Sequence, residues 1–414
     1  MHLLMKSFMI YSTNVDLRSV YLILHRKTQR YFLLMENQLR TGRKCRENPD
    51  GLHAVVAMRR IRNNEVKKMT IKEIAKICNV STATVSNVIN GKNKSSNETT
   101  KKIMDVIRES GYQPSYLAKN LRSKRTKTIG IIVEDLMLFN IPAIIEGIME
   151  CCEKNGYKII LENLRLYVRW HGEWFHNDEL RENELRDALK QVESINVDGI
   201  IYVAGHERRM EVFQKYTNLP TVVAYTQASS KNIPSVMLDD YNGGYAMTAY
   251  LLSKGHERIG VIAGEQDNAH AIHRMKGIQK AFFDHGKLFD PDLVEYVRWE
   301  REGGYSVAKK MADQKVSAIF CMSDTIAGGV YDYMNENGVV IGKDISVVGY
   351  DNRMISEYLV PKLTTMRLPL EQIGYKSADI LIGILEKNEL PENMEVRMEC
   401  QLIERDSVVD LIKC

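Results

Sequence analysis

The helical repeat of three to four residues is clearest just after Met69. The apolar residues that follow are Ile71, Ile74, Ala75, Ile77 and Cys78. Their spacing places them on one face of two helical turns. Asn79 comes next, and asparagine is one of the few residues besides glycine that tolerates the left-handed conformation of a sharp turn. The pattern predicts a short helix that ends in a tight turn.

Two more helices are predicted after this turn. Ser81 is a good N-cap for a helix from Thr82 to about Asn90, because its hydroxyl can accept from the exposed amides of the first turn. A third helix is predicted from Ser96 to Gly111, where the glycine ends it. The side chains that these helices turn inward are Val85, Val88, Ile89, Ile103, Val106 and Ile107. The arrangement is typical of a helix-turn-helix DNA-binding unit, with a small helical bundle of another kind as the alternative.

After Thr128 short apolar runs alternate with longer helical stretches. The runs read TIGIIV, YKIILENL, VDGIIYVAG, PTVVAY, RIGVIAG, SAIFCM and ISVVGY. Runs rich in isoleucine and valine suit strands that are buried on both faces of a parallel sheet, and the intervals between them leave room for crossover helices. The predicted fold class is therefore α/β, with a helix-turn-helix headpiece in front of two doubly wound parallel-sheet subdomains.

Residues 1–68 show no sustained period of either kind. Two interpretations stay open: a basic, weakly structured arm, or a segment that is not a natural part of the protein. We favour the second. A helical pattern begins directly after Met69, and the codons for Glu65 and Val66 could form a purine-rich ribosome-binding sequence upstream of it.

Charge separates the front of the chain from its body. The net charge is +4, but residues 69–127 hold 12 lysines and arginines against 4 acids, and residues 128–414 hold 31 against 44. A basic front suggests a polyanionic partner at one end, although charge runs are more often simply solvated. Seven cysteines without a CxxC pair, and no signal peptide or membrane span, predict a cytoplasmic protein that has no contact with membranes.

Motifs of the common enzyme classes are missing from the sequence. No GxGxxG opens a helix after a strand, and GxxxxGK[ST], HExxH and GxSxG do not occur. His171 and His176 lie in an aromatic insert, but they lack the spacing and support of metal ligands. We expect no enzymatic activity, no cofactor and no metal.

Two stretches resemble the lactose/galactose repressor family of bacterial transcription factors. They are TIKEIAKICNVSTATVSNVINGK and, downstream, SYLAKNLRSKRTKTIGIIV, and the likeness runs from about Met69 to Asp406. The resemblance implies a homodimeric repressor that binds a near-palindromic operator with an affinity set by a small-molecule effector, which we expect to be a sugar or sugar derivative. The alternative is a solute-binding protein of a sugar transport system, which would need an export signal and no DNA-binding head.

The resemblance also divides the chain. It implies a helix-turn-helix DNA-binding domain over 69–114, a hinge helix and linker over 115–127, and an effector-binding and dimerisation core of two subdomains over 128–414. The segment 1–68 stays a non-native or unstructured extension.

In the family, residues that match those of the second helix contact DNA. Those matching Thr82, Ala83 and Asn87 reach base edges, and those matching Ser81, Thr84 and Ser86 meet phosphate. The family usually has arginine where this chain has Asn87. Arginine reads guanine, whereas asparagine pairs best with adenine, so the half-site preference can differ from that of the common family operator.

The segment SYLAKNLRS is either a flexible basic linker or, by resemblance, a hinge helix that folds on the operator. In the second case Leu121 wedges into a minor-groove base step, Arg122 lies at the groove edge and Lys119 contributes to DNA binding.

Effector residues are expected where strands of the two sheets end. In doubly wound sheets ligands bind at the carboxyl ends of strands, a rule that points to Glu134, Asp324 and Asp351. The resemblance places Asp324, Asp351 and Arg274 in or beside an effector cleft, and Phe139 is an aromatic residue that could stack on a sugar. Each has a structural alternative: an aspartate after a strand is often only a helix cap, and Arg274 can simply pair with an acid.

Two local features bear on the ligand. Ser323 stands where the family usually has asparagine, which leaves the ligand's identity open. The aromatic insert with Trp170, Trp174 and Phe175 is read as packing rather than as a sugar platform.

Overall fold

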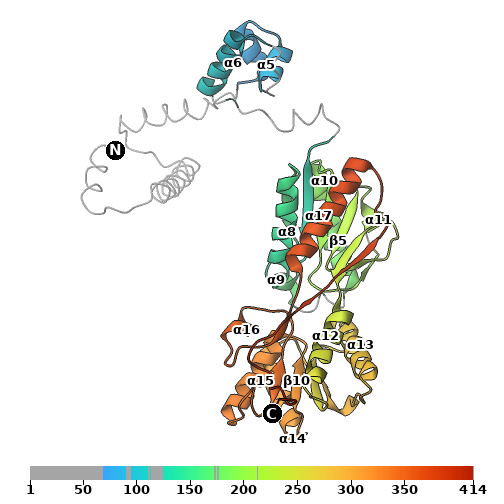
Figure 1. The fold of residues 1–414 in the computed structure, drawn as a ribbon. Helices are drawn as coiled ribbons and strands as arrows, with labels where there is room; N and C mark the ends of the chain where they lie inside the picture. Colours follow the sequence, from blue (N-terminus) through green and yellow to red (C-terminus); the bar gives the residue numbers. More distant parts are fainter. Residues whose placement is uncertain are drawn as a thin grey trace, which may run out of the picture. The chain divides into compact units, whose positions relative to one another are not determined.

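The computed structural model describes residues 69–89, 95–110, 112, 125–171, 174, 177–211 and 213–413 (Figure 1). The chain divides into two compact units, Met1–Ser115 and Tyr116–Cys414. The predicted extension over 1–68, the end of the third helix at Gly111 and the hinge helix lie outside the described residues. Among the helices of the described ranges, none is long and apolar enough to cross a membrane.

The first unit contains the three predicted helices. They are α4 (Ile71–Cys78), α5 (Thr82–Ile89) and α6 (Asn97–Ser110). Asn79 adopts the predicted left-handed conformation, with φ 55° and ψ 48°. At the start of α4, Thr70 and Glu73 form a capping box that was not predicted: each side chain accepts from the backbone N–H of the other residue.

A small apolar core holds these helices together. Its buried members are Ile74, Ala75, Cys78, Val85, Val88 and Ile103. The N–H of Val80 donates to the carbonyl of Ala75 at 2.9 Å, which closes the turn between α4 and α5. The predicted N-cap at Ser81 is present, because its hydroxyl accepts from the N–H of Thr84. The Ser96 hydroxyl accepts in the same way from the N–H of Thr99 at the start of α6. The predicted helix-turn-helix is therefore confirmed.

The second unit begins with a parallel sheet in the order β13-β7-β5-β3-β1-β2. Its strands are β1 (Thr128–Val133), β2 (Lys158–Asn163), β3 (Gly199–Val203), β5 (Thr221–Ala224), β7 (Ser235–Leu238) and β13 (Glu395–Met398). One buried cluster joins this sheet to α8 (Ile141–Lys154) and α17 (Leu370–Lys387). A second cluster joins it to α10 (Asp178–Ser194) and α11 (Phe213–Tyr216), so helices cover both faces. Short elements beside it are α9 (Leu166–Trp170), β4 (Arg209–Met210) and β6 (Gln227–Ala228).

The other subdomain has a parallel sheet in the order β11-β10-β8-β9. Its strands are β8 (Ile259–Ala263), β9 (Val294–Tyr296), β10 (Ala318–Cys321) and β11 (Ser346–Val348). Figure 1 shows helices on its two sides, which are α12 (Asp240–Ser253), α13 (Ala269–Asp284), α14 (Arg301–Asp313) and α15 (Asp324–Glu336). Two short helices, η2 (Pro291–Leu293) and α16 (Ile355–Tyr358), complete it. The predicted fold class is confirmed.

The chain passes between the subdomains after β7, after β12 (Thr365–Arg367) and after β13, which leads into β14 (Gln401–Ile403). β12 and β14 pair antiparallel beside β11. All seven predicted apolar runs form strands, whereas β7, β9 and β12 to β14 were not predicted. Because β7 and β13 both run toward the second subdomain, the carboxyl ends of the first sheet face the junction between the two.

Reciprocal glycines bring pairs of helices into backbone contact. A Cβ atom on Gly147 of α8 would lie 1.8 Å from the carbonyl oxygen of Glu371, and one on Gly374 of α17 would lie 1.9 Å from that of Ile144. Both distances are far below van der Waals contact, so only glycine allows this approach. The same reciprocity recurs in α12 with α13 and in α14 with α15, at Gly244, Gly277, Gly304 and Gly329.

We expect Gly374→Ala to destabilise the body by at least about 2 kcal/mol, because its methyl group would press against the backbone of α8. Gly383 lies in the same helix, and a Cβ there has no neighbour within 4 Å. The matched control Gly383→Ala should be neutral or stabilise by up to about 1 kcal/mol through helix propensity. Urea unfolding followed by tryptophan fluorescence is the measurement, and equal midpoints for both variants would contradict the packing argument.

Candidate functional site

Six of the predicted DNA contacts lie on α5 or directly before it. Ser81, Thr82 and Ala83 are exposed, while Thr84, Ser86 and Asn87 are half-buried and lie away from the core residues of the helix. The Ser81 hydroxyl lies 2.9 Å from that of Thr84. The helix reads TATVSNVI and carries no charged residue. Any reading of bases by it must use hydroxyl, methyl and amide groups.

The hinge residues Lys119, Leu121 and Arg122 lie outside the described residues, and their roles stay predictions.

At the subdomain junction the most buried charge pair joins Arg274 of α13 to Asp240 at the start of α12. The guanidinium Nε donates to Asp240 at 2.7 Å, and Nη1 donates to the carbonyl of Met322 at 2.5 Å. The guanidinium carbon also lies 3.7 Å from the ring centroid of Tyr350. Burial opposes the charge of Asp240, but Arg274 and His270 outweigh it and hold the pKa of this carboxyl well below its ordinary value. The structural alternative for Arg274, a pairing with an acid, therefore applies.

His270 connects the two subdomains. Its Nδ1 lies 2.6 Å from the second oxygen of Asp240, and its Nε2 accepts from the backbone N–H of Glu207 at 3.0 Å. Because Nε2 accepts, the proton of the neutral ring is on Nδ1 and points at Asp240. Glu207 belongs to the loop after β3 and His270 to α13, so this hydrogen bond crosses the junction.

Asp324 and Asp351 lie together at the strand ends of the second subdomain. Asp324 accepts from the N–H of Arg353 and from the hydroxyl of Thr365, each at 2.6 Å, and Asp351 accepts from the Ser323 hydroxyl at 3.0 Å. Ser323, not Asp324, caps α15. Burial, reinforced by the charge of Asp351, raises the pKa of Asp324 well above that of an ordinary carboxyl.

The backbone of Asp351 is held in a conformation that residues with a Cβ rarely adopt, with φ 110°. Such conformations cost about 1–3 kcal/mol and cluster at functional sites. The strain marks Asp351 as a candidate functional residue, and its contact with an effector stays a prediction.

Glu134 and Phe139 follow β1 on the other side of the junction. Glu134 is fully buried: it accepts from the Tyr202 hydroxyl and the N–H of Gly205, at 2.5 and 2.7 Å, and forms an ion pair with Arg208. Phe139 is 39% exposed, and the guanidinium of Arg353 lies 4.8 Å from its ring centroid. Phe139 and Arg353 therefore form a second contact across the junction.

Glu207, Asp240 and His270 present side-chain atoms that all lie within 4.8 Å of one another, a spacing compatible with a metal ion. The hydrogen bonds argue against that use. Nδ1 of His270 carries a proton that points at Asp240, so this nitrogen has no lone pair to offer a metal ion. The guanidinium of Arg274 already binds the same carboxylate. The absence of a metal stays a prediction.

The aromatic insert packs where the structure describes it. Trp174 is fully buried, and Arg208 lies over its ring at 5.6 Å from the centroid. Trp170 packs against the same apolar cluster. Phe175 and His176 lie outside the described residues.

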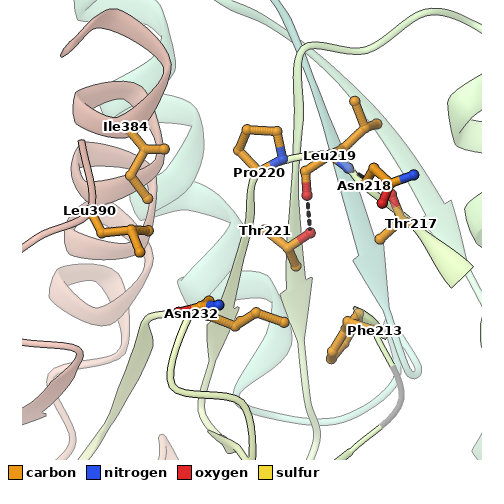
Figure 2. A pocket seen from close by; sticks show the side chains of 10 residues that line it. Phe213, Thr217, Asn218, Leu219, Pro220, Thr221, Asn232, Ile384 and Leu390 are labelled. Atoms are coloured by element: carbon orange, nitrogen blue, oxygen red, sulfur yellow. Dashed lines mark hydrogen bonds between the residues drawn. The ribbon is translucent and has the colours of Figure 1, made fainter. Parts of the chain in front are cut away.

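A separate pocket of about 570 Å³ lies at the amino ends of β5 and β7 (Figure 2). Its lining includes Phe213, Ile384 and Leu390, and its described residues carry no charged side chain. Figure 2 shows the Thr221 hydroxyl bound to the carbonyl of Leu219, at 2.9 Å. The predicted effector residues lie at the carboxyl ends of the strands, whereas this pocket lies at the amino ends. It also has none of the charged side chains found among the effector residues.

Sequence reasoning missed several residues of the junction: Glu207, Asp240, His270, His273 and Arg353. Asp240 obeys the strand-end rule, but the rule could not be applied because β7 was not predicted. His270 and His273 carry no local signal, since their role depends on packing between α13 and a distant loop.

We expect the protein to lose stability as the pH rises from about 5 to 8, because native Asp324 keeps a proton that the unfolded chain has lost above its ordinary pKa of about 4. Asp324→Asn imitates the protonated form. Over this pH range the free energy of unfolding of the variant should therefore fall by on the order of 2 kcal/mol less than that of the native chain. Thermal unfolding between pH 5 and 8 is the measurement. Asp313→Asn, an exposed carboxyl in α14, is the control; a decline in Asp324→Asn as steep as in the native chain would refute the assignment.

Comparison with known proteins adds the family. A profile described as "Bacterial regulatory proteins, lacI family" matches residues 70–115, and one for a periplasmic binding protein-like domain matches residues 248–408. The chain is 33% identical over 344 residues to the HTH-type transcriptional repressor PurR of Pasteurella multocida, covering 82% of this chain and 98% of that one. It is 33% identical over 345 residues to the HTH-type transcriptional regulator RegA of Clostridium saccharobutylicum, covering 82% and 99%.

Solved structures have the same fold. A lac repressor dimer bound to operator and the anti-inducer ONPF matches with a TM-score of 0.68 at 22% identity, over 83% of this chain and all of that one. A LacI family regulator of Enterococcus faecium with bound ribose matches with a TM-score of 0.54 at 25% identity, over 69% and 99%. The relatives are transcriptional regulators and not enzymes. The chain therefore belongs to the lacI family of bacterial regulatory proteins and is a DNA-binding regulator of transcription.

Proposed function

We propose that the protein is a homodimeric repressor whose affinity for a near-palindromic operator is set by a sugar or sugar derivative. We further propose that it is cytoplasmic and associated with the nucleoid. The observation that carries the proposal is one chain with two kinds of site: an exposed α5 tip, and a junction of two sheets lined with buried polar groups. The domain limits follow the sequence analysis: 69–114 for DNA, 115–127 for the hinge and 128–414 for effector binding and dimerisation.

For DNA, the proposed contacts are the outward side chains of α5. Thr82, Ala83 and Asn87 would reach base edges in the major groove, and the hydroxyls of Ser81, Thr84 and Ser86 would meet phosphate. The exposure of the first three residues after the turn supports this assignment. Since α5 is uncharged, we infer that the attraction to phosphate comes from basic residues elsewhere in 69–127.

For the effector, the proposed site is the subdomain junction. A regulator of this fold, CelR, has been solved with cellobiose, and the Enterococcus faecium protein with ribose. Asp351 and Phe139 are the contacts we propose first, because Asp351 has a strained backbone at the strand ends of its sheet and Phe139 remains partly exposed. Arg274, Asp324 and Glu134 would act partly through the internal partners that already bind them.

For the homodimer, we propose the apolar surface around α16. Met354, Tyr358 and Val360 are 74%, 75% and 80% exposed within seven residues of chain. A cluster of this kind on a soluble protein marks an interaction site. A second copy of the chain is the partner we propose, since two heads are needed to occupy two half-sites.

We expect the purified full-length protein to retard a genomic fragment in preference to random competitor DNA at modest ionic strength, and a sugar to change that retention some five- to 150-fold. Asn87→Ala should weaken binding to the selected fragment by about 10- to 100-fold and relax the preference at one base pair, because the amide that reads it is gone. Mobility-shift titration measures both effects.

The matched control for this variant is Asn97→Ala, an exposed asparagine in the first turn of α6. It should leave the affinity for the selected fragment within about twofold, because it removes no proposed base contact. The proposal is wrong if the protein retards no fragment selectively, either with or without sugars. Equal losses for the two variants would reject the role of Asn87 alone.

For the hinge, we propose that Leu121 wedges into a minor-groove step, with Lys119 and Arg122 beside it. Leu121→Ala should then lower specific affinity by at least about tenfold and leave non-specific affinity nearly unchanged, because only the operator is bent to receive the wedge. Titrations on the selected fragment and on random DNA make the comparison. Equal losses on the two DNAs would indicate a flexible linker instead.

A further inference from the structure

The side chain of Glu207 is left incompletely bonded at the junction. It is only 5% exposed, yet its Oε2 has no hydrogen-bond partner among the described residues. The nearest cationic or imidazole groups lie within ion-pair distance without forming a hydrogen bond: His273 Nδ1 lies 3.5 Å from Oε2, and Arg397 Nη2 lies 3.6 Å from Oε1. A buried carboxylate oxygen without a donor is costly, so the site favours a ligand that supplies one.

The neighbours of Glu207 are already engaged. The Nδ1–H of His270 points at Asp240, and Arg397 donates Nη1 to the carbonyl of Leu238 at 3.1 Å. His273 differs, because its Nδ1 is also buried without a partner in the described part of the chain. Glu207 and His273 come from opposite subdomains, so a ligand that satisfied both would bind across the junction.

A hydroxyl is the group that fits this pair. It can donate to Glu207 Oε2 and at the same time accept from, or be oriented by, His273 Nδ1. A phosphate or carboxylate can only accept, and it would meet the charge of Glu207. An ammonium group can donate to Glu207 but cannot accept from an imidazole N–H.

Charge at the junction points the same way. Two guanidinium groups at the junction are committed to buried carboxylates: Arg274 to Asp240, and Arg208 to Glu134. Arg353 instead donates to the hydroxyl of Thr325 and lies over the ring of Phe139. Among the other buried atoms of the described residues that lack a hydrogen-bond partner, two belong to residues near the junction: an acceptor on Asn140 and a donor on Trp299. Asn140 donates to the carbonyls of Ala204 and Gly205, just before Glu207. This mixture of single donors and acceptors suits a ligand that has several hydroxyl groups and no net charge.

We propose that Glu207 determines the specificity of the effector site, accepts a hydrogen bond from a hydroxyl of a neutral sugar, and excludes phosphorylated and acidic sugars. The inference rests on the proposed function, since it concerns the effector of the same site. It adds a residue and a class of ligand: the effector is a neutral polyhydroxyl compound.

The first experiment is a thermal-shift panel on the full-length protein with D-ribose, D-glucose, cellobiose, D-glucosamine, D-gluconate and glucose 6-phosphate. At least one neutral sugar should raise the melting temperature by about 2 °C or more at saturation, and the two anions should not. A larger shift with gluconate or glucose 6-phosphate than with every neutral sugar overturns the inference but leaves a sugar-controlled repressor intact. No shift with any compound contradicts the inference and the proposed sugar effector together.

The second experiment measures the affinity of the best neutral sugar by calorimetry. Glu207→Ala should weaken it at least tenfold, while Glu207→Gln, which keeps an acceptor oxygen, should weaken it less and reduce the discrimination against gluconate. Glu211→Gln, an exposed acid nearby in the chain, is the matched control and should bind as the native chain does. Unchanged affinity in Glu207→Ala overturns the inference. Stabilisation by Zn²⁺ or Mn²⁺ alone, lost in both Glu207 variants, would show that the cluster is a metal site and would also overturn it.

Discussion

Two opposite charges buried in the body hold several chain segments in place. Asp240 lies where the chain has just crossed from β7, and Arg274 lies on α13, 34 residues later. Through further hydrogen bonds the pair reaches the end of β10 at Met322 and, by way of His270, the loop after β3. Removing either partner would leave an uncompensated charge in the interior, which is strongly destabilising. The arrangement of polar groups at the junction therefore depends on this pair.

The fold could be predicted where burial on both faces makes the sequence continuous in apolar residues. That condition holds for β1, β3, β5, β8, β10 and β11, and the runs that form them were recognised. It also holds for β7, which was not recognised because its apolar run is only three residues long. It fails for β12 and β14, which are three residues long and mix polar with apolar side chains. These strands exist because neighbouring segments offer them partners, which a local pattern does not record.

The candidate site was predictable to the same degree. Carboxylates that directly follow a recognised strand were found, as with Glu134, Asp324 and Asp351. The partners of these groups come from distant parts of the chain, so sequence reasoning could name Arg274 but not say that Asp240 binds it. Glu207 and His273 were invisible for a related reason: each is ordinary in its own segment, and only the meeting of β3 and α13 brings them to 3.5 Å.

The two candidate sites differ in their chemistry. The α5 tip is exposed, uncharged and built from small hydroxyl, methyl and amide groups, which suits a solvated surface of DNA where phosphate attraction is supplied elsewhere. The junction is buried and rich in charge, and nearly every ion there has an internal partner. In the function that we propose, selectivity at the first site comes from shape and hydrogen bonds at an open face. At the second it comes from the few atoms that the protein leaves unsatisfied.

The interlocked glycine helices give each half of the body little internal compliance. Helices whose backbones are in direct contact cannot slide past one another without steric clashes. Each half of the body should therefore move as a rigid unit. Any rotation between the halves must then be absorbed as torsion in the three crossing strands. Thr128, at the amino end of β1, would then move with its half as a rigid unit. The segment directly before Thr128 joins the body to the DNA-binding head.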